Sequence, residues 1–318
     1  MEAGEKKCVW KWLWESAWRR WESFFLKKDL TGQKKSLSLP FVNYKKQHPM
    51  EQHKTIVFEE HTLHYRDEGR EHEQTLVLLH GYLQNLDIWS SYVLTYMRRM
   101  HVITIDLPGH GYSECFGEVH TMDFMARAVK AVLDDAGVEQ CVMVGHSMGG
   151  YVALAFADLF PHRLRGLGLL HSHALADTEA VIERRMTTCE QVMHNRAGYI
   201  VGFIPPLFTP ESRVALAVEI KDIHDQCLET KAESIIAAQR GMASRPSRLH
   251  VLQELEVPVL FIYGKKDPRI PVELALSQAM EARHAEILLL ENVAHMSHIE
   301  ERDYVRPRIQ NFVGTCYM

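Results

Sequence analysis

A serine framed by glycines lies where a short apolar segment meets a helix-like segment, and this junction constrains the possible fold more than any other feature of the chain. Residues 145–149 read G-H-S-M-G, between an apolar segment at 141–144 and a helix-like segment at 151–160. A serine at such a strand–turn–helix junction is forced onto a sharp, strained turn, where its hydroxyl stands above the edge of a sheet. A Cβ at either glycine would collide where strand and helix nearly touch. The junction therefore predicts that Ser147 is a catalytic nucleophile and not an incidental turn serine.

The rest of the chain after residue 55 alternates short apolar segments with helix-like segments. The strand-like segments are residues 75–79, 101–105, 141–144, 166–171, 257–263 and 285–290. The helix-like segments are residues 87–99, 121–136, 148–160, 272–282 and 305–313. This alternation predicts an α/β fold, in which a mainly parallel twisted sheet is covered by helices on both faces. Residues 55–60 and 61–66 alternate apolar with polar side chains and predict a hairpin of two further strands.

One block interrupts this pattern. Residues 173–248 contain no clear strand, are rich in helix-like segments and carry three prolines near their middle, at positions 205, 206 and 210. A helical block inserted between two sheet strands is typical of a lid over the strand ends. The apolar stretch 199–208 within the block favours an uncharged acyl or alkyl group as the ligand. We therefore expect one domain over residues 55–318, with a helical lid at about 173–248.

The first 54 residues differ in composition from the rest of the chain. Five of the six tryptophans lie at positions 10, 12, 14, 18 and 21. Four of these, together with Phe25, recur at spacings of three and four and predict one aromatic face of an amphipathic helix. We expect that this helix packs onto the domain or that the extension is unfolded. Peripheral membrane contact through residues 8–28 is the less favoured alternative, although aromatic rings flanked by Lys and Arg suit a membrane interface. The polar, Lys-rich residues 32–50 are interpreted as a linker.

The composition of the chain indicates which kinds of partner to expect and in which cellular compartment the protein works. A net charge of −5 gives no reason to expect nucleic acid. Six scattered cysteines without a C-x-x-C pair indicate reduced thiols in a cytoplasmic protein. No apolar segment approaches the roughly 18 to 20 residues needed to span a bilayer. The histidines match no zinc spacing, and His171 and His173, which follow a predicted strand, are interpreted as polar lining, so no metal site is expected.

The candidate partners of Ser147 come after it in the chain in the order aspartate, then histidine. A serine hydroxyl is a poor nucleophile until a base takes its proton, and an acid must orient that base. Asp267 follows one predicted strand and is the expected acid, with a helix cap as its alternative role. His295 follows the next predicted strand and is the expected base. Its competitor, His298, is expected to lie on the final helix.

Attack on a carbonyl group needs two N–H donors to stabilise the negative charge that develops on the oxygen. The N–H of Met148 begins the helix after the serine, where the helix dipole also favours an anion. The second donor should lie in the loop after segment 75–79, where Gly81 permits a bend and Tyr82 supplies the N–H. We therefore predict that Met148 and Tyr82 form an oxyanion hole.

Together these motifs resemble the α/β-hydrolase superfamily, and within it the lidded, single-domain, esterase-like branch. Ala294 stands where that family usually has glycine, a change of one methyl group. The resemblance implies no metal and no organic cofactor, and a scaffold role for His80, His110 and His146. The matching pieces, in the family's order over roughly residues 55–315, are 80–82 (H-G-Y), 106–113 (D-L-P-G-H-G-Y-S), 145–150 (G-H-S-M-G-G), 264–267 (G-K-K-D) and 294–295 (A-H).

The motifs and the resemblance predict a serine hydrolase that cleaves a small-to-medium carboxylic ester through an acyl-enzyme. A carbon–carbon bond hydrolase, a lyase or a cofactor-free haloperoxidase could use the same three residues, and these alternatives stay open. A non-enzymatic ligand-binding protein of this fold is disfavoured, because such proteins commonly lose a member of the triad. The expected partner is a small ester-like molecule, and the sequence does not fix the oligomeric state.

Overall fold

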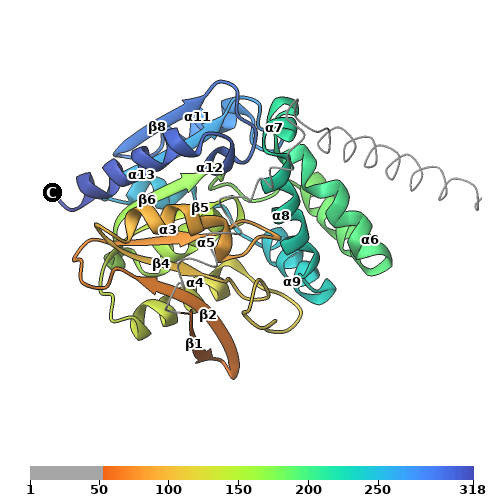
Figure 1. The fold of residues 1–318 in the computed structure, drawn as a ribbon, viewed down its shortest axis with the longest axis horizontal. Helices are drawn as coiled ribbons and strands as arrows, with labels where there is room; N and C mark the ends of the chain where they lie inside the picture. Colours follow the sequence, from red (N-terminus) through yellow and green to blue (C-terminus); the bar gives the residue numbers. More distant parts are fainter. Residues whose placement is uncertain (1–52) are drawn as a thin grey trace, which may run out of the picture. The chain divides into compact units, whose positions relative to one another are not determined.

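The computed structural model describes residues 53–318 (Figure 1). The first strand already begins at His53, two residues before the expected domain boundary. The rest of the predicted extension, with its aromatic helix and the hypothesis of membrane contact through residues 8–28, lies outside the described residues. Among residues 53–318, no helix combines the length and the apolar character needed to cross a membrane.

Within these residues, eight strands form one sheet in the order β1-β2-β4-β3-β5-β6-β7-β8. β1 pairs antiparallel with β2, β2 pairs antiparallel with β4, and the remaining neighbours are parallel. The mainly parallel sheet and the N-terminal hairpin are therefore confirmed. The strands are β1 (His53–Phe58), β2 (His61–Glu68), β3 (Thr75–Leu79), β4 (His101–Ile105), β5 (Cys141–His146), β6 (Leu164–Leu170), β7 (Val259–Gly264) and β8 (Ala285–Leu290).

The central strands are buried on both faces, which explains why their sequences are almost continuously apolar. Every residue of β3, β4 and β5 is buried. β7 begins at Val259 and not at residue 257, because Pro258 has no N–H to donate to a neighbouring strand. Parallel strands end at one edge of a sheet, so the loops that come after β3, β5, β6, β7 and β8 meet there.

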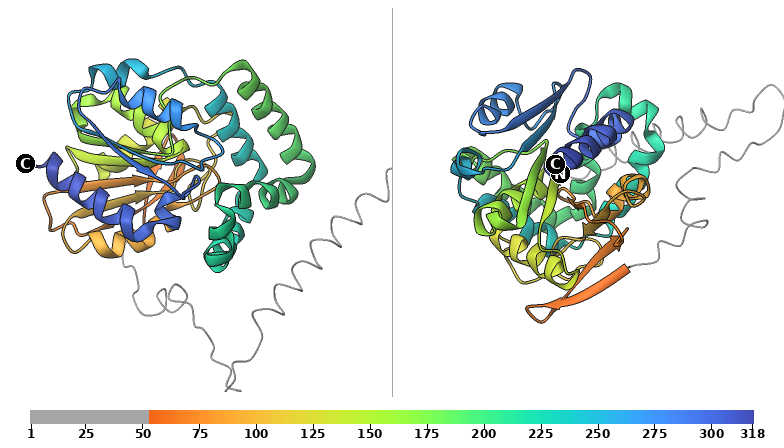
Figure 2. Two further views of the ribbon diagram at one scale, coloured as in Figure 1. Left: turned by 90° about the horizontal axis from the view of Figure 1, so that it is seen from above. Right: turned by 90° about the vertical axis from the view of Figure 1, so that its left-hand side faces the viewer.

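Helices cover both faces of the sheet, as predicted, and lie on opposite sides in Figure 2. Two tyrosine hydroxyls join the helices that lie on one of these faces. Tyr92 donates to the carbonyl of His298 at 2.9 Å, and Tyr96 donates to the carbonyl of Arg306 at 2.7 Å. The predicted helix at 87–99 is shorter than expected, because a 3-10 turn capped by Asn85 precedes it. One face carries α4 (Met122–Asp135), α5 (Met148–Leu159), α10 (Leu249–Glu254) and α11 (Val272–Ala279), and the other carries η1 (Leu86–Trp89), α3 (Ser90–Tyr96), α12 (Ser297–Glu300) and α13 (Arg302–Cys316).

The block between β6 and β7 is helical, as the sequence predicts, and its movement as a lid stays a prediction. Its longest helix, α6, departs from helical geometry at Asn195. An ion-pair cluster ties its two ends together, because Asp177 accepts from Arg185 at 2.5 Å and from Arg245 at 2.7 Å. The elements of this helical insertion are α6 (Glu179–Phe203), η3 (Pro205–Leu207), α7 (Pro210–Ala215), α8 (Ala217–Leu228) and α9 (Ala232–Ala243).

Candidate active site

Ser147 lies on a strained turn between β5 and α5. Its φ of 50° and ψ of −114° fall outside the regions that residues other than glycine normally occupy. The turn is held because the N–H of Ser147 donates to the carbonyl of Leu170 at 2.8 Å. A Cβ on Gly145 would lie 2.3 Å from the carbonyl oxygen of Gly149, so strand and helix can approach this closely only without a side chain. The expected reason is confirmed for Gly145. A Cβ on Gly149 would instead meet the carbonyl oxygens of Leu79 and His80 at the end of β3, each 2.6 Å away.

The structure brings together the three residues that the sequence singled out. Nε2 of His295 lies 3.0 Å from Oγ of Ser147, and Nδ1 of His295 lies 2.8 Å from Oδ2 of Asp267. The side chains of Asp267 and His295 are almost completely excluded from solvent. With Nδ1–H bound to the carboxylate, Nε2 carries a lone pair toward the serine hydroxyl and can accept its proton.

Asp267 accepts hydrogen bonds on both carboxylate oxygens. Oδ1 accepts from the backbone N–H of Arg269 at 2.8 Å and of Ile270 at 3.2 Å and so holds the turn after β7. The helix cap considered for this residue is not formed, because the next helix, α11, begins only at Val272, after Pro271. Burial alone would raise the pKa of Asp267, but the nearby His295 and the hydrogen bonds from His171 and His295 outweigh it and hold that pKa well below its usual range. These partners therefore favour the ionised form of Asp267.

Sequence analysis missed one member of this cluster, His171. Its Nδ1 donates to Oδ2 of Asp267 at 2.8 Å, the same oxygen that His295 uses. Its Nε2 accepts from the N–H of Ser297 at 3.3 Å, and its φ is 48°. The available signal was its position directly after β6, the strand between β5 and β7. The interpretation as polar pocket lining did not anticipate a bond to the acid.

His171, Asp267 and His295 are also the one group among the described residues whose donor atoms lie close enough together to hold a metal ion. Their hydrogen bonds do not fit that use. A metal on Nδ1 of His171 would place the ring proton on Nε2, facing the N–H of Ser297, donor against donor. The same change in His295 would remove the lone pair that faces Ser147. The cluster suits proton transfer better than metal binding.

Burial favours the neutral form of the His295 imidazole, the form that a base requires. Desolvation is the largest influence and lowers its pKa from the usual range, although the charge of Asp267 and its hydrogen bond act in the opposite direction. The competing residue, His298, lies on the short helix α12 and not, as expected from the sequence, on the final helix α13, and its ring nitrogens have no hydrogen-bond partner in the described part of the chain. It packs instead against the rings of His146 and Trp89, with centroids 4.3 and 4.9 Å away.

The neighbouring histidines hold the site together, in keeping with their expected scaffold role. His146 donates from Nε2 to the carbonyl of His295 at 2.9 Å and so joins the strand before the serine to the loop of the base. His80 donates from Nδ1 to the carbonyl of Gly81 at 2.8 Å and accepts the N–H of Leu107 at 3.0 Å. These bonds fix the loops after β3 and β4 with respect to each other.

The two expected oxyanion donors lie on elements that flank Ser147. Met148 is the first residue of α5, so its N–H has no carbonyl one turn earlier to bind. The N–H of Tyr82 makes no hydrogen bond with residues 53–318, while the next residue, Leu83, takes a φ of 65° to turn the chain. Both groups are available to an incoming oxygen, and their role stays a prediction.

The helical insertion is fastened to the loop that carries His295. The N–H of His295 donates to the carbonyl of Leu207 at 2.9 Å. The carboxylate of Glu300 bridges the same two segments, since it accepts the N–H of Thr209 and the N–H of Ala294, each at 2.9 Å. Three hydrogen bonds therefore join the backbone around His295 to the insertion.

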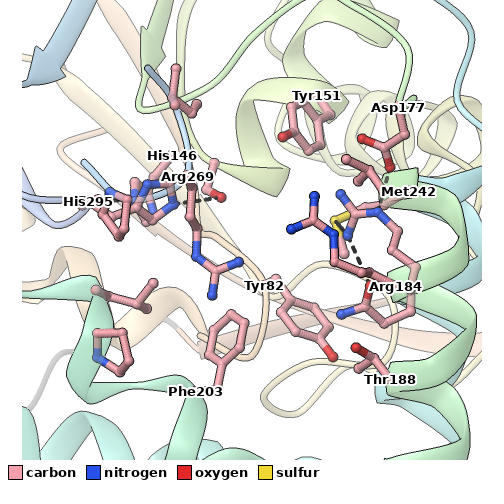
Figure 3. A pocket seen from close by; sticks show the side chains of 18 of the residues that line it. Tyr82, His146, Tyr151, Asp177, Arg184, Thr188, Phe203, Met242, Arg269 and His295 are labelled. Carbon is pink, nitrogen blue, oxygen red and sulfur yellow. Dashed lines mark hydrogen bonds and ion pairs between the residues drawn. The ribbon is translucent and has the colours of Figure 1, made fainter. Parts of the chain in front are cut away.

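A pocket of about 560 Å³ opens beside Ser147 and His295 (Figure 3). The insertion forms much of its wall, with aromatic and apolar groups such as Tyr199, Phe203 and Leu207. The apolar stretch 199–208, which favoured an uncharged acyl or alkyl group as the ligand, supplies these apolar groups, but the lining also carries arginines. The charged and polar lining comprises Gln84, His146, His173, Asp177, Arg184, Arg185, Thr188, Gln239 and Arg269, in addition to Ser147 and His295.

Comparisons with known proteins agree with this architecture. Residues 74–188 match the family described as alpha/beta hydrolase fold. An esterase from Thermogutta terrifontis has a similar structure, with a TM-score of 0.79 and 27% identity over 84% of this chain and 100% of that one. The chain is 25% identical to 2-hydroxy-6-oxononadienedioate/2-hydroxy-6-oxononatrienedioate hydrolase from Paraburkholderia phymatum, over 79% of this chain and 91% of the relative.

A third relative is longer than this chain. It is the dihydrolipoyllysine-residue acetyltransferase component of the acetoin cleaving system from Pseudomonas putida, 28% identical over 77% of this chain but 65% of its own length. Fold, family match and relatives agree, and the chain belongs to the α/β-hydrolase superfamily. The hydrolases among its relatives support a hydrolase activity.

Proposed function

We propose that the protein is a serine hydrolase that cleaves a carboxylic ester through an acyl-enzyme, with Ser147, His295 and Asp267 as its triad. The observation that carries the proposal is the unbroken chain of contacts from Oγ of Ser147 through His295 to Asp267, at 3.0 and 2.8 Å. That chain opens into a pocket large enough for a small-to-medium ester. The similarity to an esterase supports the ester as substrate.

The proposed reaction has two steps. In the first, Nε2 of His295 takes the hydroxyl proton of Ser147 while Oγ bonds to the ester carbon, and the N–H groups of Met148 and Tyr82 stabilise the oxyanion. The intermediate collapses, the ester C–O bond breaks, and His295 gives its proton to the departing alcohol. In the second step, His295 takes a proton from water, whose oxygen attacks the acyl carbon. The bond from Oγ to the acyl carbon then breaks, His295 returns the proton to Oγ, and the acid leaves.

Carbon–carbon bond hydrolysis is the second candidate, because one relative hydrolyses 2-hydroxy-6-oxononadienedioate. It uses the same three residues but releases a carbon leaving group. A lyase, a haloperoxidase or a ligand-binding protein without activity would not release both an acid and an alcohol from a simple ester. Products measured from an ester and from a vinylogous 1,5-diketo acid therefore separate the candidates.

The test is hydrolysis of p-nitrophenyl acetate by wild-type protein and by Ser147→Ala. We expect turnover to fall by about three to six orders of magnitude with the fold unchanged, since binding and the oxyanion donors persist without the nucleophile. Ser277→Ala is the matched control, because this serine lies exposed on α11 and its hydroxyl donates to the carbonyl of Leu274. A Ser147→Ala variant that keeps a tenth of the wild-type rate would remove Ser147 from the mechanism.

A further inference from the structure

Positive charge exceeds negative charge in the lining of the pocket. Three arginines line it, Arg184, Arg185 and Arg269, against one carboxylate, Asp177. That carboxylate is already shared, since Arg185 and the neighbouring Arg245 both pair with it. The lining therefore holds positive charge that the described residues do not neutralise.

Arg269 is the arginine best placed to meet a substrate. It lies two residues after Asp267, and its backbone N–H bonds to that carboxylate, so its loop is fixed with respect to the triad. Its guanidinium lies over the ring of Phe203, 4.3 Å from the ring centroid. In Figure 3 Arg269 and His295 lie at one end of the pocket, whereas Asp177 lies at the other.

The guanidinium of Arg269 forms no hydrogen bond and no ion pair with residues 53–318, and the residue is exposed. Arg245 makes an instructive contrast, because it also stacks on a ring, that of Tyr151 at 3.9 Å, but its charge is paired with Asp177. Because Arg269 only stacks on a ring, the five N–H donors of its guanidinium remain available. Their planar, forked arrangement matches the two oxygens of a carboxylate.

The second unpaired arginine, Arg184, lies on α6. Its Nε donates to the carbonyl of Ala180 at 3.3 Å, which leaves the two terminal nitrogens free for a ligand. In Figure 3 it lies at the end of the pocket away from His295. It therefore raises the positive potential of the pocket as a whole, while Arg269 is the unpaired arginine in the part of the pocket near His295.

We propose that the pocket selects esters that carry a free carboxylate, and that the guanidinium of Arg269 binds this carboxylate. This inference rests on the proposed ester hydrolysis for its choice of substrate. The monoester of a dicarboxylic acid has the required chemistry: one end is the scissile ester, and the other is the anion. The apolar wall around Phe203 and Leu207 then contacts the methylene chain between the two ends.

Two esters of equal chain length test the proposal, monomethyl adipate and methyl hexanoate, with methanol release as the assay. We expect wild-type kcat/KM to be at least about tenfold higher for monomethyl adipate. Arg269→Gln should reduce that preference by about ten- to hundredfold, the range expected for a hydrogen-bonded charge pair. Arg269→Lys should keep part of the preference, because the charge remains without the fork.

The matched control is Arg283→Gln, an exposed arginine outside the pocket lining whose guanidinium lies near Glu256. It should leave both rates unchanged. If wild type prefers methyl hexanoate, or if Arg269→Gln slows both esters equally, the carboxylate site is wrong. The latter result would leave Arg269 with the stacking contact on Phe203 alone.

Binding to the Ser147→Ala variant separates this inference from the proposed function. Calorimetric titration of that variant should show monomethyl adipate binding at least tenfold more tightly than methyl hexanoate, and the added Arg269→Gln change should abolish the difference. Equal binding of the two esters overturns the carboxylate site even if both are hydrolysed. Selective binding without hydrolysis by wild type overturns the ester hydrolase and keeps the carboxylate site.

Discussion

Replacing Asp267 by Asn tests the proposed triad most severely, because four N–H donors converge on this one carboxylate. His171 and His295 donate to Oδ2, and the backbone N–H groups of Arg269 and Ile270 donate to Oδ1. Asparagine has nearly the same shape but only one oxygen, so its NH₂ group must face a pair of donors in either orientation.

The two orientations lead to different losses. With the NH₂ group toward the backbone, two N–H groups lose their acceptor, at about 1–3 kcal/mol of folding stability each if they stay buried. With the NH₂ group toward the histidines, both rings must change tautomer, and His295 then presents Nε2–H to Ser147 and cannot take its proton. In both cases the charge that stabilises the imidazolium is gone, and we expect kcat to fall about 10³- to 10⁴-fold.

The assay is kcat for p-nitrophenyl acetate, together with the free energy of unfolding from urea titration. Asp303→Asn is the matched control, since Asp303 is highly exposed in α13 and pairs with Arg306 on the surface. It should leave kcat unchanged and alter stability by less than about 1 kcal/mol. An Asp267→Asn variant with more than a tenth of wild-type kcat would refute the assignment of Asp267 as the acid that orients the base.

The geometry of the site and of the sheet leads to four further predictions. Because burial lowers the pKa of His295 and the base must be neutral, the rate should rise with pH below about 6.5 and then level off; a rate still climbing above pH 8 would contradict a histidine base. His171→Phe removes one donor to Asp267 and should lower kcat about tenfold with KM little changed, whereas an unchanged kcat would make the bond incidental. Gly145→Ala should destabilise the fold by more than about 2 kcal/mol in urea titration, since its Cβ meets backbone; a change under about 0.5 kcal/mol would contradict the close contact. A chain that begins at Met50 should fold and hydrolyse simple esters at the full-length rate, because every proposed site residue lies beyond it, and an inactive, aggregated product would indicate packing of the N-terminal segment against the domain.

The strands and the candidate triad could be predicted from sequence because each is a local pattern. Apolar segments bounded by polar residues fixed β3, β4 and β8 at their observed ends. Ser147, Asp267 and His295 each come after such a segment, and parallel strands bring their carboxyl ends to one edge.

The remaining features depend on where individual side chains point, which a sequence pattern does not specify. Whether His171 turns toward Asp267 depends on its φ of 48° and on the order of β6 and β7 in the sheet. Which side chains of α6 face the pocket depends on the departure from helical geometry at Asn195, which rotates the second half of the helix relative to the first. Arg184 and Arg185 lie on this helix and Arg269 lies after β7, so only the tertiary arrangement brings the three arginines into one pocket.

The junction of the helical insertion with the loop of His295 limits how this enzyme can be altered. Because Leu207 and Thr209 are bonded to the backbone around the base and to Glu300, a replacement insertion must reproduce this stretch or displace the imidazole. Residues of α6 before Asn195 carry no such bond to the triad. Exchange of that first half with a relative's sequence should therefore change which molecules enter the pocket and leave the chemistry intact. One stretch of the insertion would then determine substrate choice, and another would hold the residues that catalysis needs.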